Sequence, residues 1–424
     1  MMSWRRWSEA WFLTYGLLAI IAAGITPILL PQFINLHGNT GQVGLVMAAL
    51  SLGGLTAPIW GRLAERRLHK ELIAAGLVVV GVSLLLLPSS TGIPYWLILA
   101  LLQGAGLTAI STVAGLLIVE RYPKDEWDQR MGWLMTTFGG GQVVGLVIAS
   151  FFSGTNSDSG LYIGAVFIGL AFVVALRTIH TPPKPDQVRL AGPQPVRVPH
   201  VAASPASTHH HWGHVSPQGA IKALQSPFGE FILGNSLLTL ASGLIFIPYP
   251  LLFSTSYHVS PSTSSLAFGI AAALAIFWYP LAGNLSHRRG ALSVLTSFLV
   301  VRGISFAALL VLAMATTSAR GFLAEASFLL TVNSWPFITV SATVAAAELA
   351  PTDEGTTMGI YNAATALVNT VSALAAGLIA AQWGYKGLPV FATIIMLGAV
   401  AVTLHVGRKQ RLTKAASSDV EVFS

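Results

Sequence analysis

The chain has 424 residues, of which 54% are apolar and only 9% are charged. A soluble domain carries about 25% charged residues, so this composition excludes a soluble fold and predicts an all-α membrane protein. The formal net charge of +7 is typical of a membrane protein with bases on its cytoplasmic side, so no nucleic-acid partner is expected. The chain lacks cysteine, which excludes disulfides, thiolate metal sites and cysteine nucleophiles.

Apolar segments long enough to cross a bilayer as helices, about 20 residues each, recur along the chain. Twelve are expected, at 11–33, 42–61, 71–88, 95–119, 131–153, 160–178, 229–252, 264–284, 291–315, 321–347, 357–382 and 387–406. The stretch 179–228 is rich in Pro, Ser, Ala and His and has little apolar surface to pack, so it is expected to be a disordered linker. The predicted organisation is one six-helix half at 1–178, this linker, and a second half with a tail at 229–424.

The basic residues predict the orientation of these helices. All Lys and Arg residues except Arg302, Arg320 and Lys386 fall in the two tails, the linker or the loops on the same side. By the positive-inside rule, both termini and the linker are expected in the cytoplasm. We therefore expect a multi-pass protein of the cell (inner) membrane, with the lipid bilayer as its surroundings.

One basic loop occurs twice, half a chain apart. The first copy, PIWGRLAERRLHK, runs from Pro58 to Lys70, and the second, PLAGNLSHRRGA, runs from Pro280 to Ala291. A second repeated pattern, Glu followed by Pro-x-Asp-Glu and Met-Gly, comes after the fourth and the tenth predicted helix. The duplication predicts two six-helix halves in the same orientation, related by a pseudo-two-fold axis.

At these residues the chain resembles the major facilitator superfamily of secondary transporters. The best-known motif of that family is a Gly-x-Leu-Ala-Asp-Arg-x-Gly-Arg-Lys loop between helices 2 and 3. The first loop matches it at Gly61, Leu63, Ala64, Glu65, Arg66 and Lys70, with Glu for Asp, and departs from it at Leu68 and His69. The second loop keeps Gly283, Leu285, Arg288 and Gly290. The resemblance covers all twelve helices and implies alternating access to a site between the halves.

The resemblance also implies a gating role for the repeated loops. Charge pairs at the cytoplasmic helix ends would hold the halves together while the site faces outward, and would break when it faces inward. The candidate gating residues are Gly61, Glu65, Arg66, Arg67, Glu120, Arg121, Gly283 and Arg288. The alternative is that these bases only fix the topology.

The fifth helix carries part of a glycine motif that marks exchangers in this family. Gly132, Gly141 and Gly145 have the family's spacing, whereas the Pro and the final two glycines of the motif are replaced. This partial match favours the twelve-helix drug/proton antiporter type. The alternative is close helix packing, which small residues permit. In the fourth helix Ala100 stands where the family has an Arg before Gln-Gly.

Two ionisable residues are expected well inside the membrane. Arg302 lies about 16 Å along its helix, and Glu325 lies several residues into the tenth. A charge at a helix centre costs about 2.5–3.5 kcal/mol on insertion scales, so each requires a reason. Glu325 and Arg302 are the candidate coupling residues, with Glu325 as the proton site. The alternatives are a structural ion pair between neighbouring helices, or an Arg302 that snorkels from a peripheral helix.

Uncharged polar residues lie on the first, fourth, seventh and tenth helices, which line the cavity in this family, and one more lies on the eleventh. The candidate substrate-binding residues are Tyr15, Gln103, Thr108, Asn235, Ser242, Asn333, Trp335 and Asn362. Amides, hydroxyls and aromatic rings with few charges suit a small neutral or amphipathic substrate. The alternative is hydrogen bonding between helices. The linker histidines His209, His210, His211 and His214 lack a carboxylate or Cys nearby, and no metal site is expected.

The sequence therefore predicts a monomeric, proton-coupled exporter of a small molecule by alternating access. An importer of a neutral nutrient or metabolite is the alternative within the same class. A non-transporting membrane sensor or assembly factor on the same fold is the alternative of another class. No cofactor, catalytic residue or nucleotide-binding loop is expected, so the protein is not predicted to be an enzyme.

Overall fold

The computed structural model describes residues 10–65, 69–89, 91–123, 127–154, 156–179, 225–349 and 354–422. Within these ranges some residues are described by their backbone alone, namely 58, 62, 65, 115, 116, 119–121, 127–129, 131, 354–359 and 411–422. The predicted linker lies almost entirely outside the described residues. The described residues form helices joined by short turns and contain no strand.

The helices of the first half begin near the N-terminus. They are α1 (Phe12–Ala19), the π-helical η2 (Ile20–Ile25), α2 (Thr26–His37), α3 (Thr40–Leu52), the 3₁₀-helical η3 (Gly53–Thr56), α4 (Ala57–Glu65), α5 (His69–Leu86), α6 (Ile93–Arg121), α7 (Trp127–Phe152) and α8 (Ser157–Thr178). The second half contains α10 (Pro227–Phe246), α11 (Tyr249–Ser256), α12 (Pro261–Arg289), α13 (Ala291–Met314), α14 (Arg320–Asn333), α15 (Trp335–Glu348), α16 (Glu354–Trp383) and α17 (Gly387–Val422).

The prediction of twelve spans is confirmed, because the described residues contain 12 helices long and apolar enough to cross a membrane. We number these spans in chain order. The end of the bundle where span 1 begins at Phe12 and span 6 ends at Thr178 is called the proximal end. The opposite end, with the turns at Asn39, Gly92 and Gly384, is called the distal end.

Three spans differ from the uninterrupted helices that the sequence predicts. Span 1 contains the π-helical η2, a distortion that often marks functional sites. The chain of span 7 breaks between α10 and α11 around Pro248, and span 10 breaks at Ser334, just before Pro336. Proline lacks the N–H that an α-helix needs, which accounts for both breaks. In addition, α17 continues as a helix to Val422, well past its predicted end at 406.

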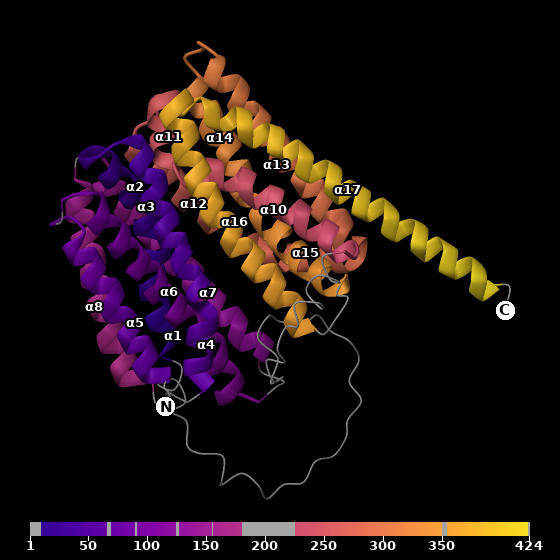
Figure 1. Cartoon of the computed structure of the whole chain (residues 1–424), viewed down its shortest axis with the longest axis horizontal. Coiled ribbons are helices and arrows are strands. Elements are labelled where there is room, and N and C mark those ends of the chain that lie inside the picture. The colour runs from indigo at the N-terminus through magenta and orange to yellow at the C-terminus, as the bar shows by residue number, and fades with distance from the viewer. Residues whose placement is uncertain are drawn as a thin grey trace, which may run out of the picture.

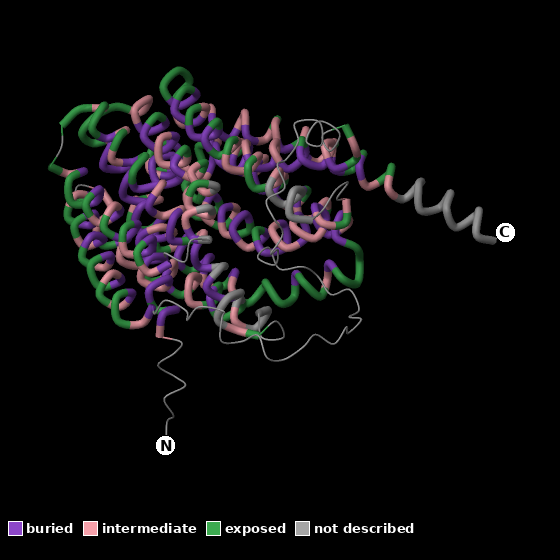
Figure 2. The backbone as a smooth tube through the Cα atoms, turned by 60° about the horizontal axis from the view of Figure 1, so that its bottom comes forward, coloured by how far each residue is buried: buried purple, intermediate pink, exposed green. Residues whose placement is uncertain are grey.

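The two halves lie side by side, the first in indigo to magenta and the second in pink to yellow (Figure 1). Each buries apolar side chains among its own helices, and green exposed residues lie mainly on the outside (Figure 2). Large apolar side chains such as Val166, Phe322 and Leu397 are exposed there. Such exposure is expected of helices surrounded by lipid.

Candidate functional site

The halves meet at the distal end through glycines of spans 2 and 11. A Cβ added at Gly44 would lie 2.5 Å from the Cα of Gly377 and 2.7 Å from the carbonyl oxygen of Ala373. Since only glycine at both positions allows this approach, the two backbones are in direct contact. Further towards the end, Gly41 faces Ala381, with 3.8 Å between the added Cβ and the alanine Cβ.

Polar side chains also join the halves at the distal end. The hydroxyls of Ser153 in the first half and Ser265 in the second lie 3.0 Å apart. The Tyr385 hydroxyl donates to the side-chain oxygen of Asn35 across 3.4 Å. Burial raises the pKa of Tyr385 to about 12, so its hydroxyl stays neutral and can donate at physiological pH.

The proximal end carries the predicted gating residues, and only part of them is described. A Cβ added at Gly61 or at Gly283 would meet nothing within 4 Å, and Arg288 is exposed. Arg66 and Arg67 lie outside the described residues, as do the side chains of Glu65, Glu120 and Arg121. The predicted charge pairs therefore stay a prediction. Open space around both motif glycines contrasts with the glycine contact at the distal end.

The fifth-span glycines contact span 1. Cβ atoms added at Gly141 and Gly145 would clash with the carbonyl oxygens of Gly16 and Ile20. Ile20 begins the π-helical η2, so the distorted part of span 1 packs directly against α7. Gly132 has open space instead. Two of the three motif glycines thus serve close helix packing, whatever further role they have in transport.

The predicted substrate residues of the first half are bound within that half. Tyr15 is buried, and its hydroxyl donates to the carbonyl oxygen of Ile110 at 3.2 Å. Gln103 is fully buried and donates from Nε2 to the hydroxyl of Thr26 at 2.9 Å. Thr108 donates to the carbonyl oxygen of Gly104 in its own helix. These bonds favour a structural role for Tyr15 and Gln103, the alternative that the sequence left open.

The second half brings together more of the predicted residues. Arg302 of α13 is fully buried and donates three hydrogen bonds. They go to the hydroxyls of Ser242 and Ser334, at 3.0 and 3.2 Å, and to the carbonyl oxygen of Thr331 at 2.8 Å. The guanidinium carbon lies 4.9 Å from the ring centre of Trp335. Arg302 therefore reaches from span 9 to spans 7 and 10, at the break in span 10.

Glu325 has a different partner from the one considered in the sequence. The Tyr249 hydroxyl lies 3.0 Å from Oε2 of Glu325 and 2.8 Å from the carbonyl oxygen of Ser264, and it donates to one of the two. No ion pair joins Glu325 to Arg302 in the described part of the chain. Oε1 of Glu325 is buried without a hydrogen-bond partner. The Arg302–Glu325 ion pair, one of the alternatives that the sequence left open, is therefore not formed among the described residues.

An aromatic cluster surrounds this carboxyl group. The ring of Tyr249 stacks on that of Phe328, with centres 3.8 Å apart and planes at 15°. Phe328 also contacts Phe246, Phe253 and Phe268. Phe246 connects this cluster to Arg302, since its ring contacts Phe328 and lies 5.8 Å from the Arg302 guanidinium. The sequence could not reveal Tyr249, which lies 76 residues before Glu325.

The remaining predicted residues differ in exposure. Asn235 is buried and donates to the hydroxyl of Thr365 at 3.4 Å, which joins spans 7 and 11. The side-chain oxygen of Asn333 accepts a hydrogen bond from the Trp278 indole at 2.6 Å. Asn362 is exposed, and Trp335 keeps 41% of its surface exposed. Trp335 and Asn362 are thus the predicted residues most open to a substrate.

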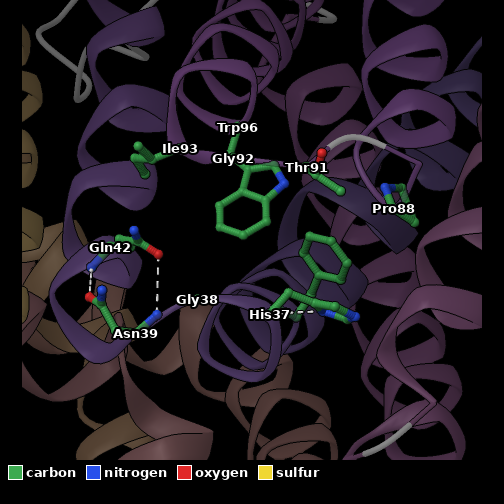
Figure 3. Close-up of a pocket in the computed structure, with 10 residues that line it drawn as sticks. His37, Gly38, Asn39, Gln42, Pro88, Thr91, Gly92, Ile93 and Trp96 are labelled. Atoms are coloured by element: carbon green, nitrogen blue, oxygen red, sulfur yellow. Dashed lines mark hydrogen bonds between the residues drawn. The ribbon is translucent and has the colours of Figure 1, made fainter.

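A distal pocket of about 360 Å³ was not predicted from the sequence. Trp96 and His37 line it together with the capping pair Asn39 and Gln42 (Figure 3). The imidazole of His37 lies 3.7 Å from the carboxylate of Asp158. The pocket belongs to the first half alone, so it lies apart from the contacts between the halves.

The described residues contain no group of three or more His, Cys, Asp or Glu side chains that could hold a metal ion.

The family model of the Major Facilitator Superfamily matches residues 11–354 and 231–422. A tetracycline resistance protein, class E, from Escherichia coli is 25% identical over 166 residues, 39% of this chain and 40% of that protein. The quinolone resistance protein NorA of Staphylococcus aureus is 24% identical over 169 residues, 39% of this chain and 44% of that protein. The chain thus spans about two fifths of the length of these relatives.

Solved structures resemble the whole chain. The nucleoside transporter NupG gives a TM-score of 0.72 at 14% identity, covering 96% of this chain and 99% of that one. A bacterial homologue of the human lysosomal transporter Spinster, inward-facing and occupied, gives 0.73 at 15% identity, covering 96% and 98%. Likeness at such low identity shows the fold alone. Together with the match of the family model across the chain, the twelve spans establish that this protein belongs to the major facilitator superfamily of transporters.

Proposed function

We propose that this transporter exports a small amphipathic molecule in exchange for protons, with Glu325 as the proton-binding group. The observation that carries the proposal is the setting of Glu325, whose carboxyl group lies 3.0 Å from the Tyr249 hydroxyl beside an aromatic cluster. The other described acids of the spans lie near helix ends, as Glu71 and Glu230 do. A protein that moves protons across a membrane needs a side chain within its spans that can bind and release a proton.

Alternating access would occur by a change at the contacts between the halves. The distal contact of Gly44 with Gly377, together with the Ser153–Ser265 pair, would close the site on that side. Open space at Gly61 and Gly283 supports access from the proximal end in this state. With the basic residues at the proximal end in the cytoplasm, the described state would face inward, with both termini inside a cell membrane. The transporter would act as a monomer, since each chain holds both halves.

Export is favoured by the relatives, whose names refer to resistance to tetracycline and quinolone. Replacing Glu325 by Gln should affect coupling rather than folding, because the carboxyl group has one unpartnered oxygen and makes no ion pair among the described residues. The importer alternative predicts that substrate and proton move in the same direction. A non-transporting sensor would move neither.

The proposal is tested with purified protein in liposomes that contain the pH indicator pyranine. Ethidium, dansylglycinamide and dansylglycine serve as cationic, neutral and anionic amphipathic probes, each added outside without a pH gradient. We expect entry of at least one probe to move protons outward through the wild-type protein but not through Glu325→Gln. Glu230→Gln, which alters a carboxylate 2.8 Å from Lys409 at the proximal end, serves as the control. Protons that enter with the probe, or proton movement that Glu325→Gln retains, would contradict the proposal.

A further inference from the structure

The buried guanidinium of Arg302 has no acidic partner among the described residues. Its side chain is 0% exposed, and the three acceptors bound to it, from Ser242, Ser334 and Thr331, are all neutral. A buried charge is normally paired, because moving it out of water is costly. The second half therefore holds a positive charge that its own described side chains do not neutralise.

The hydrogen bonds of Arg302 leave part of its donor capacity free. A guanidinium has five N–H donors in a planar fork, and this one uses one on Nε and one on each terminal nitrogen. The second N–H of each terminal nitrogen has no acceptor in the described part of the protein. Two N–H groups on neighbouring nitrogens suit a carboxylate, which Arg binds through paired hydrogen bonds.

The rings above the guanidinium are partly open. Trp335, with 41% of its surface exposed, lies 4.9 Å from the guanidinium carbon, and the half-buried Phe246 lies 5.8 Å from it. These rings come from spans 10 and 7, and their centres are 6.4 Å apart. Spans 7 and 10 are two of the helices that supply the candidate substrate residues. A ligand that packs against Trp335 would thus approach the uncompensated charge.

Span 10 is also suited to movement at this point. Its helix is interrupted at Ser334, between α14 and α15, and Arg302 binds Ser334 and the carbonyl oxygen of Thr331 beside this break. The indole of Trp335 stands directly after it. A shift of Trp335 at the break would uncover the guanidinium without unfolding either helix.

From these observations we propose that the transported molecule carries a carboxylate on an aromatic or apolar body. Its carboxylate binds Arg302, and its body packs on Trp335 and Phe246. This inference rests on the proposed transport function and narrows its substrate class from neutral or amphipathic compounds to organic anions. Glu325 stays on the other side of the aromatic cluster with Tyr249, so that anion binding and proton binding use separate groups.

The test measures equilibrium binding without any gradient, so it is independent of proton coupling. The probes are three matched pairs of a carboxylate and its amide: dansylglycine, cinnamate and phenylacetate, with dansylglycinamide, cinnamamide and phenylacetamide. Binding to the purified protein in detergent is followed by quenching of tryptophan fluorescence and by the shift in thermal midpoint. We expect at least one carboxylate to bind ten times more tightly than its amide.

Variants assign this preference to Arg302. In Arg302→Met the carboxylate should bind no more tightly than the amide, while the affinity for the amide stays within twofold of wild type. Arg302→Lys keeps the positive charge but not the planar guanidinium, so it should prefer the carboxylate over the amide by a smaller factor than wild type does. This variant replaces Arg302→Met in the test if the Met variant is unstable. Glu230→Gln, which alters a carboxylate paired with Lys409 at the proximal end, should bind both members of the pair as wild type does.

Three outcomes would overturn the proposal. In the first, the wild-type protein binds no carboxylate of the panel more tightly than its amide. In the second, the preference survives in a folded Arg302→Met protein. In the third, Arg302→Lys lowers the thermal midpoint but leaves the full preference, which would assign Arg302 to the support of the break in span 10 alone.

Discussion

Adding one methyl group at Gly44 should open the distal end of the transporter. In Gly44→Ala the new Cβ would lie 2.5 Å from the Cα of Gly377, whereas carbon atoms pack at about 3.5–4.0 Å. All three atoms that the methyl group would meet, the Cα and the amide nitrogen of Gly377 and the carbonyl oxygen of Ala373, are backbone atoms that no rotamer change can move. Spans 2 and 11 must therefore separate by about 1 Å, or the closed state must be lost.

The size of the effect follows from the cost of overpacking. Forcing an extra methyl group into a close contact costs about 1–3 kcal/mol. Because the contact joins the two halves only when the distal end is closed, this cost falls on the closed state. The equilibrium between distally closed and distally open proteins should then shift by about 5- to 150-fold.

The assay uses the absence of native cysteine. Cysteines introduced at the exposed Leu36 and Gln382, one in each half at the distal end, carry spin labels for distance measurement by pulsed electron resonance. Gly44→Ala should raise the population at longer distances. Gly54→Ala is the matched control in the same span, because its Cβ would meet nothing within 4 Å. A Gly44→Ala distribution equal to that of wild type would refute the reasoning.

Three further predictions concern other parts of the chain. Gly61→Leu and Arg66→Ala should each slow transport at normal protein levels, because the motif glycine and base would act when the proximal end closes; wild-type rates in both would leave the loop as a topology signal only. Gln103→Leu removes the hydrogen bond of 2.9 Å between Gln103 and the buried Thr26 hydroxyl, so it should destabilise the protein by about 0.6–2 kcal/mol without changing its affinity for the probes. Loss of probe binding at an unchanged thermal midpoint would assign Gln103 to the substrate site instead. A cysteine at Ser216 in the linker should resist labelling by an impermeant maleimide in intact cells, and strong labelling there would overturn the orientation.

The spans and their halves could be predicted from the sequence because each rests on local composition. Apolar length predicts a helix in lipid wherever it occurs, and the repeated loops at Gly61 and Gly283 show the duplication. The breaks at Pro248 and Ser334 were missed, because membrane helices often pass through a proline without interruption when neighbours satisfy the backbone. The hydrogen bond that Arg302 donates to the Thr331 carbonyl oxygen at the second break depends on tertiary packing, which the sequence does not reveal.

The candidate site was predicted less well, since its contacts join distant segments. The sequence selected Arg302, Glu325, Ser242 and Trp335 because ionisable and polar residues are rare in the spans. The ion pair between the two charges, one of the alternatives it left open, is not formed among the described residues, because Arg302 binds Thr331 and Ser334, which lie further along span 10 than Glu325 does. Residue type alone likewise could not separate Gln103, bonded within its half, from the open Trp335.

The central claim is that Glu325 couples transport to protons, and one ratio tests it most directly. The probe is one that the wild-type protein transports. The ratio divides its rate of transport driven by an imposed pH gradient by its rate of exchange across the liposome membrane without a gradient. In Glu325→Gln we predict that driven flux falls at least tenfold while exchange stays within twofold of wild type. Driven flux and exchange that both remain at wild-type levels in Glu325→Gln would contradict the account.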